Sequence, residues 1–157
     1  MTPGPRLEAG ERVLRSWPAR SLGNTTTRAS SGELVLTTQA IRFEPRPGLF
    51  GGARSGRTGR RSPLEHVASA SPHRSELRIG YGDRVVFEGV IVAGITYEFG
   101  QGIRSRAVLE EIAVARQLRR RELGLPDDLA PCRSCGRWIA TESFLCPACS
   151  TLRSPSR

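Results

Sequence analysis

The sequence contains no lysine, because all 24 of its basic residues are arginine. This absence excludes a Walker A phosphate loop, a Schiff base and a lysine general base. A genome rich in G and C is enough to produce such a composition. Guanidinium groups also bind phosphate better than ammonium groups do, so the bias is compatible with an anionic partner. The 15 acidic residues leave a formal net charge of +9.

Long apolar runs are also absent. The longest run, Val90–Ile95, is far shorter than the roughly 20 residues that cross a bilayer. The N-terminal residues lack the apolar core of a secretory signal, so we expect a cytoplasmic protein. With 38% hydrophobic and 25% charged residues, the chain has the composition of a globular protein. Its 157 residues allow one ordinary domain and a small appendage.

The cysteines form two CxxC pairs near the C-terminus, separated by ten residues: Cys132, Cys135, Cys146 and Cys149. Each pair can offer two thiolates to one tetrahedral ion, at about 2.3 Å per Zn–S bond. Because so small a segment buries little apolar surface, metal binding should supply most of its folding free energy. Paired disulfides are disfavoured without a secretory signal, and a single redox dithiol needs no second pair.

The ten-residue spacer is long enough for a short β-hairpin that brings the two cysteine pairs together. Gly136 is expected to supply a turn with positive φ after the first pair. We expect four apolar residues to surround the metal: Trp138, Ile139, Phe144 and Leu145.

The string CRSCGRWIATESFLCPACS is similar to the short zinc ribbon of prokaryotic proteins, written C-x2-C-G-x9-C-P-x-C-G. Ser150 replaces the final glycine of that pattern. The resemblance implies one structural Zn²⁺ held by Cys132, Cys135, Cys146 and Cys149. Such a site has no open coordination position, so we expect no catalysis by the metal.

Residues 9–101 are predicted to form mainly strands. Apolar residues alternate with period two in Leu34–Thr38, Ile41–Phe43, Leu77–Tyr81 and Ile95–Phe99. The segment Gly80–Asp83 has turn composition and predicts a hairpin between two strands. Several short strands of this kind indicate a mainly β fold, an antiparallel barrel or sandwich.

A helix is predicted from Ser105 to Leu123, followed by the terminating residues Gly124 and Pro126. Its apolar stripe consists of Val108, Leu109, Ile112, Ala115 and Leu118. Such a C-terminal helix would cap the open end of a barrel or cover the edge of a sandwich.

This order resembles a GRAM or bacterial pleckstrin-homology (PH-like) domain. Gly10–Leu14 is similar to the opening strand of that family, and Gly32–Phe43 is similar to its G-x-L-x-L-T-N-x-R-L-x-F hairpin. Ser62–Val67 is similar to its following I-P-L-x-x-I strand. The resemblance implies a PH-like domain over residues 9–122 that includes the helix 105–123. A linker (123–131) and a zinc ribbon (132–150) would follow, with flexible tails at 1–8 and 151–157.

Four arginines occur without any acid in a stretch rich in glycine and serine: Arg54, Arg57, Arg60 and Arg61. We expect residues 51–62 to be a mobile loop. In a PH-like topology it emerges at the same end of the barrel as the connection that carries Arg20 and Arg28. That end would meet an anionic membrane surface, where each basic residue adds about 1 kcal/mol. It would alternatively bind nucleic-acid phosphates, or be a solvated loop with a protein partner elsewhere.

A second basic cluster, Arg116 and Arg119–Arg121, lies in the last turns of the helix, where cations complement the helix dipole. Neither His66 nor His73 has a nucleophile or carboxylate at a recognisable motif spacing. We therefore expect no enzymatic activity and no small-molecule substrate.

These features predict a non-enzymatic cytoplasmic adaptor whose PH-like domain docks on a protein partner or on anionic lipid. Lipid binding would bring it to the inner membrane face. Nucleic-acid binding through the arginine loop is the main alternative. A ubiquitin-binding role like that of the PH-like GLUE domain joined to zinc fingers in an ESCRT-II subunit is disfavoured. Such a finger needs Trp where this chain has Ala130, Asn where it has Ile139, and a Thr-Phe pair after Cys135.

Overall fold

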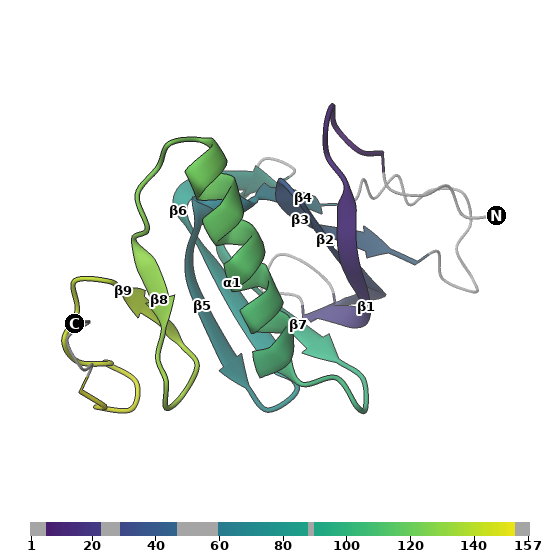
Figure 1. The fold of residues 1–157 in the computed structure, drawn as a ribbon. Coiled ribbons are helices and arrows are strands. Elements are labelled where there is room, and N and C mark those ends of the chain that lie inside the picture. Colours follow the sequence, from purple (N-terminus) through teal and green to yellow (C-terminus); the bar gives the residue numbers. More distant parts are fainter. Residues whose placement is uncertain (1–5, 23–28, 47–59, 88–89, 153–157) are drawn as a thin grey trace.

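The computed structural model describes residues 6–22, 29–46, 60–87 and 90–152 (Figure 1). Seven antiparallel strands form one sheet in the order β4-β3-β2-β1-β7-β6-β5. Their bounds are β1 Val13–Leu22, β2 Ser30–Thr37, β3 Ala40–Pro45, β4 Arg60–Pro63, β5 Val67–His73, β6 Glu76–Phe87 and β7 Val90–Phe99. A 3₁₀ turn, η1 (Leu64–His66), joins β4 to β5. The helix α1 (Ser105–Glu122) and a short hairpin of β8 (Leu129–Pro131) and β9 (Trp138–Ala140) follow.

The predicted hairpin over residues 32–43 is confirmed as β2 and β3. Leu34 pairs with Phe43 and Leu36 pairs with Ile41, and all four side chains are buried. Alternation brings these residues to one face of the sheet, where they fill the core. Gly32 is required at its position, because a Cβ there would collide with the carbonyl oxygen of Glu44.

The helix α1 lies over one face of the sheet and packs on β5, β6 and η1 (Figure 1). Val108, Leu109, Ile112 and Ala115 are buried, as the stripe predicts. Leu118 was wrongly included in that stripe, because 54% of its surface is exposed. In the second half of the helix, the buried face continues through Arg116 and Arg120 instead.

Two expectations about the strands were wrong. Gly80–Asp83 is not a turn between strands, because β6 runs through it with a shift of register against β7. Glycine inside a strand commonly marks such a bulge. Residues 51–62 are not wholly a loop either, because Arg60–Pro63 pairs with Ala40–Phe43 as β4. The segment Ser62–Val67 is likewise interrupted by η1 rather than continuous as a strand.

The connections β1–β2 and β3–β4 begin and end at the same end of the sheet. The antiparallel register places Ser21 opposite Ser30, and Gly32 opposite Pro45, at this end. The strand ends that flank the two connections therefore lie together, whereas residues 23–28 and 47–59 of the connections lie outside the described residues. Among the described helices, none has the length and apolar character needed to span a membrane.

Candidate metal centre and its junction with the barrel

The four cysteine sulfurs form a compact cluster, in which all Sγ atoms lie within 4.8 Å of one another. Cys132 lies 3.6 Å from Cys149, and Cys135 lies 3.6 Å from Cys146, measured between sulfurs. A tetrahedral ion with metal–sulfur bonds of about 2.3 Å requires sulfurs about 3.8 Å apart. A disulfide requires about 2.05 Å. The cluster therefore fits one tetrahedral metal ion and not two disulfides.

The two CxxC pairs share one backbone geometry. The Gly136 N–H donates to the Cys132 carbonyl and the Ser150 N–H donates to the Cys146 carbonyl, both at 2.9 Å. Gly136 has φ +76° and Ser150 has φ +57°. The predicted role of Gly136 is confirmed. Ser150 adopts the left-handed conformation that the ribbon pattern assigns to glycine.

The thiols differ in acidity. Hydrogen bonding with the side chain and backbone of Thr151 lowers the pKa of Cys149 to about 6. The backbone N–H of Cys135 lowers the pKa of Cys132, whereas burial raises the pKa of the Cys135 thiol to about 12. A bound cation favours the thiolate at every position, because metal ligation requires deprotonation.

The spacer does not form the hairpin that we expected from its length. Instead β8, which precedes the first cysteine pair, pairs with β9 directly after it, so that Leu129 lies opposite Ala140. A single bridge between Leu145 and Leu152 encloses the second pair in the same manner. Each cysteine pair is thus carried in the loop between two short paired segments.

The apolar residues expected around the cysteines are divided between two environments. Ile139 packs against the cysteine cluster, as predicted, whereas Trp138 belongs to the core of the barrel. Neighbouring strand residues point to opposite faces, which explains this division. Phe144 and Leu145 do not enclose the cysteines, because 75% and 48% of their surfaces are exposed.

Buried arginines connect this segment to the barrel. Arg116 donates through Nε to the Val67 carbonyl at 3.0 Å and through Nη2 to Asp128 at 2.8 Å. Its guanidinium also lies 5.7 Å from the centre of the Trp138 ring, within cation–π distance. Arg120 donates to the carbonyls of Pro126 and Glu65. The predicted dipole-complementing cluster is therefore largely a structural junction.

Arg106, near the start of α1, binds the first cysteine loop directly. Its guanidinium donates to the carbonyls of Arg133 and Ser134. A Cβ on Gly136 would lie 3.1 Å from Cγ of Pro72 in β5, which shows how closely this loop approaches the sheet. The cysteine segment therefore packs on β5 and α1.

The arginines predicted to contact anions have different environments. Arg28, Arg54 and Arg57 lie outside the described residues. Arg60 begins β4, and Arg20 is exposed near the end of β1. Arg61 forms ion pairs with Glu8 at 3.2 Å and with Glu11 at 3.6 Å, so acidic groups of the chain itself already contact its guanidinium.

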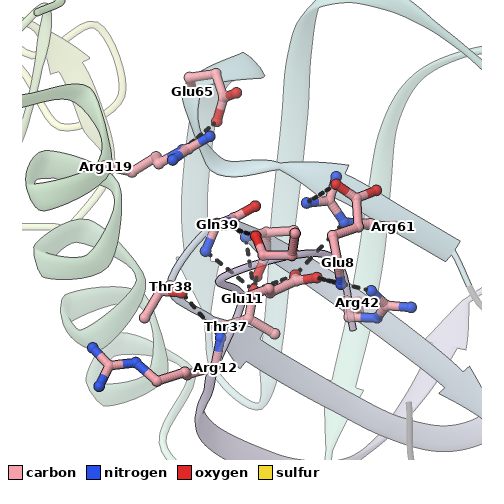
Figure 2. Close-up of polar contacts among 12 residues, drawn as sticks. Glu8, Glu11, Arg12, Thr37, Thr38, Gln39, Arg42, Arg61, Glu65 and Arg119 are labelled. Carbon is pink, nitrogen blue, oxygen red and sulfur yellow. Dashed lines mark hydrogen bonds and ion pairs between the residues drawn. The ribbon is translucent and has the colours of Figure 1, made fainter. Parts of the chain in front are cut away.

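Glu11 is the centre of a buried polar cluster that sequence analysis missed (Figure 2). Its carboxylate accepts hydrogen bonds from the Thr37 hydroxyl at 2.6 Å and from the Glu8 N–H at 2.9 Å. It also pairs with Arg42 at 3.3 Å. A single acidic residue before a strand usually lies on the surface, so the sequence gives no signal that Glu11 is buried. Its burial depends on Arg42 and Arg61, which are distant in the sequence.

Burial alone would raise the pKa of Glu11. The hydrogen bonds from Glu8 and Thr37, together with the positive charges of Arg61 and Arg42, outweigh burial and lower this pKa. The cluster is internally paired and joins the segment before β1 to the β2–β3 turn and β4.

Comparisons with solved structures identify the fold. The hSac2 domain from human phosphoinositide phosphatase Sac2 is 16% identical, with a TM-score of 0.50 over 77% of this chain and 76% of that one. The Vps36 N-terminal PH domain is 12% identical, with a TM-score of 0.46 over 75% and 86%. The Slm1 PH domain in complex with inositol-4-phosphate is 10% identical, with a TM-score of 0.43 over 68% and 95%.

No family model matches the chain, and no curated relative matches it at a significant level. At these identities the likeness extends to the fold alone. The order of the seven strands, the C-terminal helix and the likeness to the hSac2 domain together establish a PH-like fold, to which a four-cysteine segment is added.

Proposed function

We propose that this chain is a non-enzymatic binding module, a PH-like domain of the GRAM type whose four cysteines hold structural Zn²⁺. The observation that carries the proposal is the cluster of four sulfurs within 4.8 Å, packed on the barrel through Trp138. Four thiolates are the donor set of structural zinc sites, which leave no open position for a substrate. The metal thus orders a surface and performs no chemistry.

A protein partner is the first candidate for what this module binds. The cysteine segment adds a second wall beside α1, so the fold presents a composite surface that the barrel alone would lack. The core of the PH-like domain is already large enough to fold without the cysteine segment. On this proposal the segment therefore serves binding, because it holds a second wall in place beside α1. On this proposal the protein is a cytoplasmic adaptor.

An anionic membrane is the second candidate. It is favoured by the common end of the β1–β2 and β3–β4 connections, where the exposed Arg20 and Arg46 lie among the described residues. Several basic residues at one end would give reversible docking on the inner membrane face. Nucleic acid would compete for the same arginines, and its binding would weaken steeply with salt.

The metal assignment is tested by measuring zinc in the purified chain by elemental analysis. We expect one Zn²⁺ per chain in the unaltered protein and its loss in Cys146→Ser. The matched control is Ser134→Ala, which changes an exposed side chain in the first cysteine loop and leaves every thiol in place. Full zinc content in Cys146→Ser would contradict the four-cysteine assignment.

A further inference from the structure

A groove with a volume of about 450 Å³ lies between α1 and the β8–β9 hairpin. Ala113, Val114 and Gln117 line its helix side, and Leu129, Pro131 and Trp138 line its hairpin side. Its size falls in the range of pockets that hold a few apolar side chains. Figure 1 shows β8 running beside α1, with β9 on the far side of β8.

The charge of this groove is opposite to the charge of the chain. Its lining includes the carboxylates of Glu110 and Asp127. Arg116, the one cation among the described lining residues, is paired with Asp128. Glu110 is 69% exposed and lies 4.0 Å from Arg106, a separation that gives at most a weak ion pair. Gln117 donates to one oxygen of Asp127, which leaves the other oxygen for a bound cation. An acidic groove in a chain of net charge +9 is complementary to a basic segment.

The backbone of β8 offers hydrogen bonds along the same groove. The Thr141 N–H donates to the Asp128 carbonyl, and the Cys132 N–H donates to the Arg137 carbonyl. In an antiparallel ladder, the backbone N–H and C=O groups of every second residue point toward the partner strand. Asp128 and Cys132 bond toward β9, so the N–H and C=O of Leu129 point away from β9. Among the described residues, β8 pairs with no strand other than β9, and it contacts α1. An extended peptide can add to such an edge as a further strand.

Trp138 provides an independent indication of a missing partner. Its indole N–H is buried, and within the described part of the chain it has no hydrogen-bond acceptor. Buried polar groups are normally satisfied, so an orphan donor in the lining of a groove calls for an explanation. A backbone carbonyl of a bound segment would supply the acceptor once the neighbouring side chains of the lining shift to expose the N–H.

We propose that this groove binds an extended segment of a partner protein, with apolar side chains between two basic residues. This inference rests on the proposed binding function and names the class of its partner. Glu110 and Gln117 are seven residues apart, about 10 Å along a helix. Three or four residues of extended chain span this distance, so the two basic residues are three or four positions apart.

The test uses fluorescein-labelled hexapeptide mixtures with arginine fixed at positions 2 and 5 and apolar residues varied at positions 3 and 4. We expect saturable binding in fluorescence anisotropy, with a dissociation constant of about 10–100 µM. Mixtures with glutamate fixed at positions 2 and 5 should not bind. The absence of saturable binding of the arginine mixtures up to about 1 mM would overturn the proposal.

A matched pair of helix variants locates the binding. Val114→Arg places a cation in the groove and should weaken binding at least about tenfold. Leu118→Arg makes the same change one turn later, at a side chain that is similarly exposed and lies outside the groove lining. Equal effects of the two variants would overturn the proposal. Both side chains are exposed, so we expect unchanged thermal unfolding, which is measured in parallel.

The double variant Glu110→Gln, Asp127→Asn tests the charge complementarity and should weaken binding about tenfold. Zinc content is measured on each sample. Full zinc content without peptide binding in the unaltered protein would overturn the proposal that the groove binds a peptide, and would leave the proposed zinc site unaffected. Binding that persists in a protein without zinc would instead contradict the structural role of the metal.

Discussion

Gly136 and Ser150 hold equivalent turns after the two cysteine pairs, although only one of them is glycine. Both have positive φ, and both donate to the carbonyl of the first cysteine of their pair. For residues other than glycine, the left-handed conformation costs roughly 1–2 kcal/mol. The second turn therefore contains strain that the first lacks.

Opposite substitutions at these two positions should have opposite effects on stability. Ser150→Gly should raise the free energy of unfolding by about 0.5–1 kcal/mol, because it removes the strain. Gly136→Ala should lower it by about 1–2 kcal/mol, because it adds strain and crowds Pro72 and Arg106. Urea denaturation of the zinc-loaded proteins measures both values. A change of the same sign in both variants would contradict the equivalence of the two turns.

Glu11 predicts a specific dependence of stability on pH. Because its pKa is lowered in the folded chain, it contributes stability above the pKa of the unfolded chain, near 4.5. This contribution is lost as the pH falls through the folded pKa. Glu11→Gln should cost about 2–4 kcal/mol at neutral pH, because Arg42 and Arg61 lose their buried counter-charge.

The difference between the unaltered protein and Glu11→Gln should shrink as the pH falls below about 4.5. Chemical denaturation across this range measures it, with the exposed Glu142→Gln as control. A difference that stays constant from neutral to acid pH would show that the charge of Glu11 is not what stabilises the cluster.

At the scale of elements, the helix and the cysteine segment behave as one unit. Arg116 connects α1, β5 and the start of the hairpin, and it packs over Trp138. Arg116→Met would leave a buried carbonyl and a carboxylate without their donor, so it should lower the free energy of unfolding by about 2–4 kcal/mol.

Arg121→Met is the control for Arg116→Met. It removes an exposed cation from the same helix end and should change stability by less than about 0.5 kcal/mol. Thermal or urea unfolding distinguishes the two variants. Losses of equal size would favour the helix dipole over the junction as the role of these arginines.

Sequence patterns predicted the elements whose signals are local. The β2–β3 hairpin, the helix 105–122 and the turns at Gly124 and Gly136 follow from alternation, helical spacing and positive φ. The cysteine spacing likewise predicted which thiols meet. Each of these features is determined by residues within about one turn or one hairpin.

Long-range contacts determined what the sequence did not predict. The Gly80–Asp83 segment continues as a strand because its neighbour β7 accommodates a bulge there. Trp138 joins the barrel core rather than the cysteines, and Glu11 is buried by arginines far along the chain. The groove beside α1 exists only because the cysteine segment packs on β5, which no local pattern encodes.

At the scale of the whole molecule, the described residues of the two proposed contacts belong to different elements. Arg20 and Arg46 lie where β1 and β3 end, whereas the acidic groove is lined by α1 and the β8–β9 hairpin. Membrane attachment and peptide binding would therefore use different parts of the surface.

Neutralising Arg54, Arg57, Arg60 and Arg61 together tests the basic end. Cosedimentation with liposomes that contain phosphatidylserine should fall several-fold, because each basic residue contributes about 1 kcal/mol. Arg61→Gln alone is the control, since this side chain is paired with Glu8 and Glu11. Liposome binding that survives the fourfold variant would exclude these arginines as the membrane contact. Loss of liposome binding to a nucleic acid competitor would favour nucleic acid as the partner.

The last strand of the sheet, β5, has no further strand beside it among the described residues, and the cysteine segment packs against it. Exposed strand edges are templates on which other chains assemble. If the cysteines hold Zn²⁺ as proposed, copies made in a cell short of zinc would lack the ordered segment that packs on β5 and contains Trp138. The supply of metal would then set the fraction of chains that fold completely, and chaperones and proteases would remove the rest.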